Sequence, residues 1–173
     1  SAETRGLHIR GAADTVRFDD WLSLSRDGNK KTGAADRIRS IDLSIKDFYL
    51  IGQHLEAHRV RLDRSAQDWL LQIEGEDIVG SVVVPYDFAG DRSLVLDMTK
   101  LRLPGDESKS DFESSLDPRS LPAIQLKAAE FAFGDRYLGA VEANFEKIEA
   151  GLEAVSIISK DASYGITGTG RWV

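Results

Sequence analysis

A strand–turn–strand phrase that occurs twice constrains this chain more than any other feature of its 173 residues. The first copy opens on Ile41-Asp-Leu43 and the second on Ile124-Gln-Leu126. Further positions match at similar spacing, pairing Phe48 with Phe131, Gly52 with Gly134, Leu55 with Leu138 and Trp69 with Leu152. Repeated β hairpins are typical of a stacked, extendable β array rather than a closed globule.

Each copy closes on an Ile-x-Gly triplet, at 78–80 and at 166–168, and a third triplet lies at 9–11. We therefore expect the chain to begin at the tail of one repeat and to end at the tail of another. This predicts one continuous array in four parts. Residues 1–37 hold the end of a preceding repeat with a short helix and a mobile loop, 38–104 the first β repeat, 105–120 a mobile acidic loop, and 121–173 the second β repeat.

Apolar and polar residues alternate with a period of two, which is the pattern of a half-buried strand. From residue 39 onward this predicts strands around 39–46, 54–62, 68–75, 77–85, 93–104, 123–133, 137–148, 151–159 and 162–172. Ala and Glu in 137–148 also favour a helix, but Val141, Ala143 and Phe145 alternate with polar residues, so we predict a strand there. Short strands joined by tight turns predict a mostly β fold, an antiparallel meander of repeated strands.

One short helix is expected near residue 20, where Asp19 or Asp20 is suited to cap the segment DDWLSLS. Before it, residues 1–18 contain only two short apolar stretches, LHI and VRF. The polar, aperiodic segments 25–37 and 105–120 are predicted to be mobile loops.

Alternation places a large apolar set on one face of the sheet. Its members, and hence the candidate groove residues, are Ile41, Leu43, Ile45, Leu71, Ile73, Val82, Val84, Leu94, Leu96, Ile124, Leu126, Val141 and Phe145. A single short helix is too little to cover them, and large exposed apolar patches are rare on soluble monomers. Two interpretations remain open from the residues: a sheet that packs on itself around a closed core, and a curved trough whose inner face holds acyl chains.

Composition excludes several other classes of function. The net charge is −7 and the basic residues form no cluster, which argues against a nucleic-acid partner. The chain has no cysteine, so disulfides and thiolate metal sites are excluded. No apolar run approaches the ~20 residues that span a bilayer. Nothing near Ser1 reads as a signal peptide, so we expect either a removed leader or a fragment of a longer protein.

No catalytic, cofactor or metal site is predicted. His54, Glu56 and His58 share one strand face in HLEAH and could bind Zn²⁺, but a solvated face is the commoner reason for such a pattern. The acidic loop with Asp106, Glu107, Asp111 and Glu113 lacks the spacing of an EF-hand. A Ser-based triad is excluded because all three His precede residue 59 and no G-x-S-x-G motif is present. The three Trp residues, at 21, 69 and 172, are interpreted as core residues.

The phrase that carries the second repeat also resembles a known family. The YhdP branch of the AsmA-like proteins has the pattern DPR-LPALDL…L-FG-R-LG-L…-GL…L-L…-G-GRW, which is similar to residues 117–172, from DPRSLPAIQL to TGTGRW. The stretches DWLLQIEGEDIVGSVVVPYDF and LVLDMTKLRLP resemble the segment that precedes it, and FDDWLSL resembles a short helix of that family. The resemblance covers about 38–173, with Ile124-Gln in place of the usual Leu-Asp.

The resemblance implies a function that the residues alone leave open. Members of this family are large envelope proteins of Gram-negative bacteria, anchored in the inner membrane by one N-terminal helix. Their periplasmic part is a long β structure with an apolar groove. The resemblance therefore implies a curved, groove-like sheet in a periplasmic piece of a longer, non-enzymatic protein that moves phospholipid towards the outer membrane. It favours the trough over the closed core.

Overall fold

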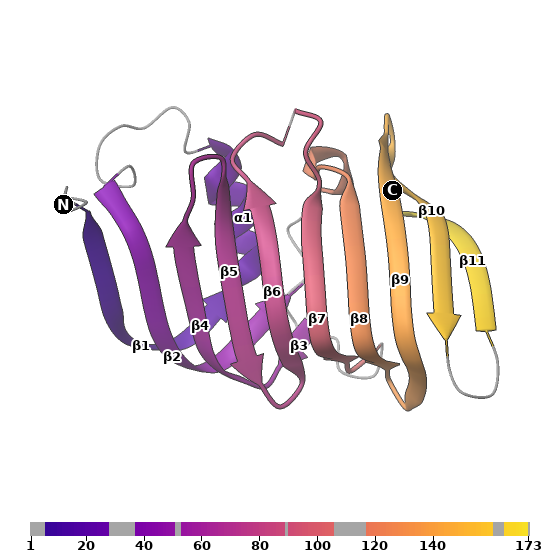
Figure 1. The fold of residues 1–173 in the computed structure, drawn as a ribbon, viewed down its shortest axis with the longest axis horizontal. Coiled ribbons are helices and arrows are strands. Elements are labelled where there is room, and N and C mark those ends of the chain that lie inside the picture. The colour runs from indigo at the N-terminus through magenta and orange to yellow at the C-terminus, as the bar shows by residue number, and fades with distance from the viewer. Residues whose placement is uncertain are drawn as a thin grey trace.

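The computed structural model describes residues 6–27, 37–50, 53–88, 90–105, 117–160 and 165–172. They form one eleven-stranded sheet in the order β1-β2-β4-β5-β6-β7-β8-β9-β10-β11, with β3 paired to β2 (Figure 1). The strands are β1 (Leu7–Arg17), β2 (Ile38–Leu50), β3 (Gln53–Leu55), β4 (Ala57–Arg64), β5 (Asp68–Gly75), β6 (Ile78–Pro85), β7 (Leu94–Leu103), β8 (Ile124–Phe133), β9 (Arg136–Ile148), β10 (Gly151–Lys160) and β11 (Gly165–Trp172). The helices of the described part are α1 (Phe18–Asp27) and the short 3-10 helix η4 (Pro118–Ser120). The predicted mostly β fold with a short helix near residue 20 is confirmed.

Strand β9 shows how alternation decides this fold. Val141 and Ala143 are buried while Glu142 and Asn144 are exposed, so one side of the strand packs and the other meets water. Ala and Glu favour a helix intrinsically, but a helix would spread the apolar residues around its axis instead of gathering them on one side. Burial of one side therefore outweighs helix propensity, and the strand predicted at 137–148 is confirmed.

Strand β1 differs from the expectation of two separate apolar stretches in residues 1–18. It is continuous from Leu7 to Arg17 and pairs with β2 along its length. Its middle, GAAD at 11–14, lacks the β-branched and aromatic residues that mark strands in a sequence. Its backbone hydrogen bonds to β2, rather than its own side-chain pattern, therefore hold this segment in the sheet.

Two strand pairs are parallel, β1 with β2 and β7 with β8, whereas a meander contains antiparallel pairs. A parallel pair requires a connection that returns across the sheet, and here these connections are 18–37 and 104–123. Strand β1 therefore occupies the position that β7 has in the next repeat. The Ile-x-Gly triplet at 78–80 lies on β6, whereas the triplet at 9–11 lies on β1, the counterpart of β7. The prediction that the triplet at 9–11 has the same place in its repeat as the other two is therefore wrong. The division at 38–104 and 121–173 stays a prediction, and strands of both parts lie in one sheet.

Gly80 is the one described glycine of the Ile-x-Gly triplets whose surroundings exclude a side chain. Its φ is 156°, and a Cβ atom there would lie 2.5 Å from the carbonyl oxygen of Asp97 and 2.6 Å from the Cα of Met98. The register between β6 and β7 shifts at this point, which brings the β7 backbone close. At Gly168, the matching position of the second repeat, a Cβ would meet nothing within 4 Å.

Replacing Gly80 by Ala is expected to lower the free energy of unfolding by about 2–3 kcal/mol, because the β7 backbone must move and a non-glycine residue is strained at this φ. The matched variant Gly168→Ala is expected to change it by less than about 1 kcal/mol. Urea denaturation of both variants tests this difference. Equal effects of the two substitutions would contradict the close approach of β7 at Gly80.

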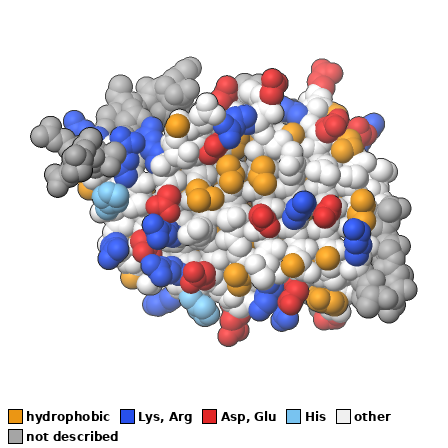
Figure 2. All heavy atoms as spheres, viewed as in Figure 1, with side chains coloured by type: hydrophobic (Ala, Val, Ile, Leu, Met, Phe, Trp, Pro, Cys, Tyr) orange, Lys and Arg blue, Asp and Glu red, His pale blue; other side chains and the backbone are white. Residues whose placement is uncertain are grey.

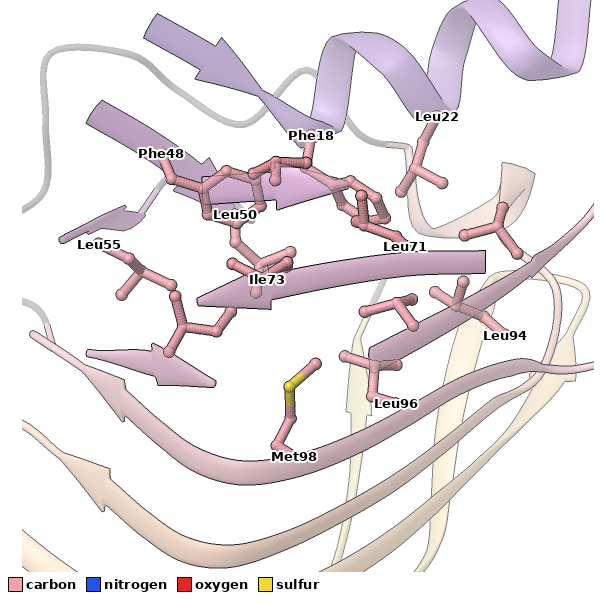
Figure 3. Close-up of a cluster of buried hydrophobic side chains, with 14 of the residues drawn as sticks. Phe18, Leu22, Phe48, Leu50, Leu55, Leu71, Ile73, Leu94, Leu96 and Met98 are labelled. Carbon is pink, nitrogen blue, oxygen red and sulfur yellow. The ribbon is translucent and has the colours of Figure 1, made fainter. Parts of the chain in front are cut away.

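Helix α1 and a folded-over part of the sheet cover one face of the first repeat, which we call the inner face; the opposite face is the outer face. The end of β2, from Phe48 to Leu50, pairs with β3 rather than with β4, and we call this pair the flap. Because β3 contacts β7, the flap reaches across the inner face. Figure 3 shows side chains of α1 and the flap together with those of β5 and β7, among them Phe18, Leu22, Phe48, Leu55, Leu71, Ile73, Leu96 and Met98.

Most of the two predicted loops lies outside the described residues, at 28–36 and 106–116. The acidic cluster Asp106, Glu107, Asp111 and Glu113 lies outside them too, as does the side chain of Trp172. Trp21 and Trp69 pack against the core as predicted, with their ring centroids 6.4 Å apart in an edge-on arrangement.

Candidate functional site

The strand register gathers apolar residues into one row across the inner face. We call it the apolar row; from β1 to β10 its members are Ile9, Ile41, Leu62, Leu71, Val82, Leu96, Leu126, Ala143 and Ile157. It ends on Gly168 of β11. Because each member stands directly opposite the next, the row runs through both repeats without a polar side chain.

The other predicted groove residues lie beside the apolar row. On one side, Leu43, Ile73 and Val141 belong to the next row. On the other side, Leu94, Ile124 and Phe145 face one another, and Val84 follows Val82 by two residues on β6. Ile45 lies further along β2, opposite Ala13. The structure therefore brings the predicted set together on one face, as alternation requires.

Sequence reasoning missed several members of the inner face. Val60, Leu62 and Met98 are buried there, and the alternation of RVRL at 59–62 and of LVLDM at 94–98 would have identified them. Ile9 and Ile157 carry no such signal. Strand β1 lacks clear alternation, and β10 has a register shift between Ala154 and Ser156 that moves Ile157 onto this face.

Burial is greatest in the middle of the apolar row. Over β5–β7 Leu71 is 4% exposed, Val82 1% and Leu96 8%, because α1 and the flap seal this part. Ile9 and Ile41 at one end of the row are half-buried, and so are Leu126 and Ile157 of the second repeat, on either side of the buried Ala143. There the described cover is smaller: η4 contacts β10, and Leu121 beside it is buried. The second repeat therefore keeps apolar surface that solvent, or a ligand, can reach.

The outer face carries charges of both signs (Figure 2). One row of it runs through Arg10, Asp42, Arg61, Gln72, Ser81, Asp97, Lys127 and Glu142. Arg59 donates two hydrogen bonds to Asp42, at 2.8 and 2.6 Å, and this pair holds the pKa of the Asp42 carboxyl below its usual range. This face therefore meets water, although Leu70, Val83 and Val95 also place a short apolar row on it (Figure 2). The fully buried apolar side chains lie on the inner face.

The structure separates the three residues of the alternative metal site. Glu56 lies between β3 and β4 and donates its backbone N–H to Asp77 at 2.9 Å, so His54 and His58 belong to different strands. His54 instead contacts Asp47 at 2.8 Å and packs on Tyr49, with ring centroids 5.1 Å apart. Within the described ranges, no three His, Cys, Asp or Glu side chains are grouped to hold a metal ion.

Replacing His54 and His58 together by Gln is expected to change the free energy of unfolding by less than about 1 kcal/mol, because an exposed polar contact such as that of His54 with Asp47 contributes little. Thermal melts with and without added zinc measure this. A loss of several kcal/mol, or a melting temperature that rises with zinc in the unmodified protein alone, would restore the metal site.

This protein is one sheet built from repeated groups of strands, with an apolar face and a charged face, and with parallel strand pairs where one group follows the next. Such an arrangement defines a β-array protein. The YhdP protein family matches residues 1–173, and the chain belongs to that family. The resemblance carried by the phrase at 117–172 is thereby confirmed. No curated protein and no solved structure matches the chain. Among the described residues, no helix has the length and apolar character needed to span a membrane.

Proposed function

We propose that this chain is a segment of a periplasmic lipid-transfer protein whose inner face carries phospholipid acyl chains from the inner towards the outer membrane of a Gram-negative envelope. The apolar row is the observation that supports this most strongly, since it crosses ten strands and both repeats without a charge. Hydrocarbon is held by burial of apolar area and needs no directed polar contact. Membership of the YhdP family supports the same function.

The proposal includes a partner, a location and a mode of attachment. The partner is phospholipid, and no nucleic acid, cofactor, metal or catalytic residue is assigned. The location is the periplasm. Attachment to the inner membrane is by an N-terminal helix outside this chain, as the family resemblance implies.

Burial indicates where acyl chains would first contact this segment. Ile124, Leu126 and Phe145 of the second repeat are half-buried and lie side by side on β8 and β9. Over β5–β7, α1 and the flap occupy the inner face, so hydrocarbon passing there runs beside them or displaces them. The second repeat is therefore the part of the face at which lipid contact is expected.

A closed structural scaffold is the second candidate function. The full burial of Val84 and the 1% exposure of Val82 favour it for the first repeat, since these side chains pack like those of an ordinary core. In this alternative α1 and the flap never move, and the inner face holds no ligand.

Photo-crosslinking separates the two candidates. The photoreactive amino acid p-benzoylphenylalanine would replace Leu126 on the inner face, and Lys127 on the outer face as the matched control. In cells labelled with radioactive phosphate, the lipid-transfer proposal expects labelled phospholipid on the protein from position 126 and none from 127. Equal labelling, or none at either position, would support the scaffold.

A further inference from the structure

One corner of the sheet forms a single body with α1. The end of β1 pairs with the end of β2, with Val16 opposite Phe48 and Arg17 opposite Tyr49, and β2 pairs in turn with β3. Helix α1 continues directly from Arg17, and the ring of its first residue, Phe18, packs on Phe48. We call this body, which consists of α1, the flap and the adjoining end of β1, the lid. Because its parts are bonded to or packed on one another, they would move together.

Two short stretches connect the lid to the rest of the sheet. In β2, pairing with β4 ends at Ser44 and pairing with β3 begins at Phe48. Among the described strands, residues 45–47 of β2 therefore pair on the β1 side alone. The second connection is Glu56, which lies between β3 and β4. A hinge consists of a few such residues, which absorb the change in φ and ψ when a larger body turns.

The second connection is fastened to the turn between β5 and β6. The backbone N–H of Glu56 donates a hydrogen bond to Oδ2 of Asp77 at 2.9 Å, and the backbone N–H of Asp77 donates one to the oxygen of Glu56 at 3.2 Å. Gly75 lies so close that a Cβ atom there would be 2.2 Å from that oxygen. The backbone oxygen of Asp77 accepts a hydrogen bond from Arg102 of β7 at 2.8 Å. Asp77 thus ties the base of the lid to the sheet.

The second repeat contains the same phrase without a sealed lid. Phe48 and Leu55 of the flap are fully buried, whereas their counterparts Phe131 and Leu138 are half-buried and the nearby Phe133 is exposed. Strand β9 also runs unbroken through the position at which β3 ends and β4 begins. One chain therefore holds this strand–turn–strand phrase in two arrangements, one sealed over the inner face and one more exposed.

Apolar contacts keep the lid closed in water. Opening would expose side chains that are at most 5% exposed in the closed form, together with the inner-face residues beneath them; those of the lid are Phe18, Leu22, Phe48, Leu50 and Leu55. Hydrocarbon removes this penalty, because acyl chains cover the same surfaces that water would otherwise meet. A ligand that binds the open form alone shifts the equilibrium towards that form.

We propose that acyl chains displace the lid from the inner face and that Asp77 is the positioning residue that holds the lid closed. The proposal rests on the proposed function, since it assigns how the same ligand reaches β5–β7. With the lid displaced, Leu71, Val82 and Leu96 would join the half-buried residues of the second repeat in one open apolar surface. Loss of the Asp77 carboxylate removes a hydrogen bond of the closed form, so it favours opening.

The distance between two spin labels measures the position of the lid. The chain has no cysteine, so labels attach only to introduced ones. His54→Cys on β3 with Glu142→Cys on β9 is the lid pair, and Arg61→Cys on β4 with Glu142→Cys is the control pair within the sheet. The probes are monomeric dihexanoyl phosphatidylglycerol and glycerophosphoglycerol, which is its headgroup without acyl chains. We expect the lipid, and not the headgroup alone, to add a longer distance in the lid pair and to leave the control pair unchanged.

Three variants test the role of Asp77 in this measurement. Asp77→Ala removes the acceptor of the Glu56 N–H, Asp77→Asn keeps an oxygen that can accept it, and Glu76→Ala alters the exposed neighbour as the matched control. The lipid concentration that opens half of the molecules is expected to fall about tenfold in Asp77→Ala, as loss of a charge-assisted hydrogen bond predicts. It should stay near the unmodified value in Asp77→Asn and Glu76→Ala. A merely structural role of Asp77 would instead disturb the control pair.

Three results would overturn this inference. The first is a lid distance that no lipid concentration changes, in the unmodified protein and in Asp77→Ala alike. The second is equal opening by the lipid and by glycerophosphoglycerol, and the third is the same half-opening concentration in Asp77→Ala as in the unmodified protein. Each leaves the proposed function standing if lipid still crosslinks at position 126. Absence of that crosslink in the unmodified protein is the separate failure of the proposed function.

Discussion

Replacing Val82 by Asp is expected to unfold the protein or to leave it marginally stable. Val82 is 1% exposed and lies in the apolar row between Leu71 and Leu96, beneath α1 and the flap. A carboxylate at this place has no described polar partner in its row and is shielded from water. Burying it is expected to cost about 3–5 kcal/mol, a large part of the 5–15 kcal/mol that stabilises a typical domain.

The matched control is Val83→Asp, on the same strand with its side chain on the outer face. It should lower the free energy of unfolding by about 1 kcal/mol or less, mainly through lost strand preference. Far-UV circular dichroism and urea denaturation measure both variants. A Val82→Asp protein as stable as Val83→Asp would show that the inner face of the first repeat is open to water, contrary to the structure.

Replacing Leu126 by Asp is expected to keep the fold and to lower lipid binding about tenfold. Leu126 lies in the same row but is half-buried, so its carboxylate can reach water at a cost of about 1–2 kcal/mol. A charge there must be desolvated by any hydrocarbon that passes over it. Lipid bound per protein is therefore expected to fall by about tenfold, since each 1.4 kcal/mol of lost affinity is a factor of ten.

Gln125→Asp is the control for this variant, because Gln125 is exposed and points to the outer face. It should retain both the fold and the lipid. The two readouts are the urea midpoint and the phospholipid content after extraction. A folded Leu126→Asp protein with normal lipid content would exclude the second repeat as a path for acyl chains.

Alternation was sufficient to predict most of the fold and the membership of the inner face. It works at Ile41 and Leu43 because one side of the strand packs while Asp42 and its outer-face neighbours meet water, and the sheet repeats this division from strand to strand. It failed for β1, whose middle is GAAD and whose position depends on hydrogen bonds to β2. Backbone hydrogen bonds between distant segments do not depend on the local alternation of side chains, so that alternation does not predict them.

Features that depend on three-dimensional proximity also could not be predicted from local sequence patterns. The Ile-x-Gly triplets look alike, yet at Gly80 a neighbouring backbone excludes a side chain and at Gly168 none is near. The His54–His58 spacing suggested one strand face, but the break at Glu56 ends β3 before β4 begins. The cover of the inner face by α1 and the flap depends on Phe18 and Phe48 meeting across 30 residues, with ring centroids 6.3 Å apart.

Arg64 illustrates the same limit for the surroundings of a charged side chain. In the sequence it is one of several arginines, at the end of RVRLDR, and nothing there distinguishes it from Arg59 or Arg61. Only the fold packs it against the rings of Trp69 and Tyr86, while Arg59 and Arg61 pair with carboxylates on the outer face. Residues that share a charge thus acquire different roles from the face on which alternation puts them.

The central claim, that the inner face holds phospholipid, is tested most directly by extracting the purified protein with organic solvent and measuring lipid by mass spectrometry. The protein would be purified without detergent, in parallel with Leu126→Asp and Gln125→Asp. The account predicts phospholipid in amounts comparable to the protein in the unmodified form and in Gln125→Asp, and about a tenth of that in Leu126→Asp. Folded, unmodified protein with no phospholipid above the buffer blank would contradict the claim and leave the closed scaffold in its place.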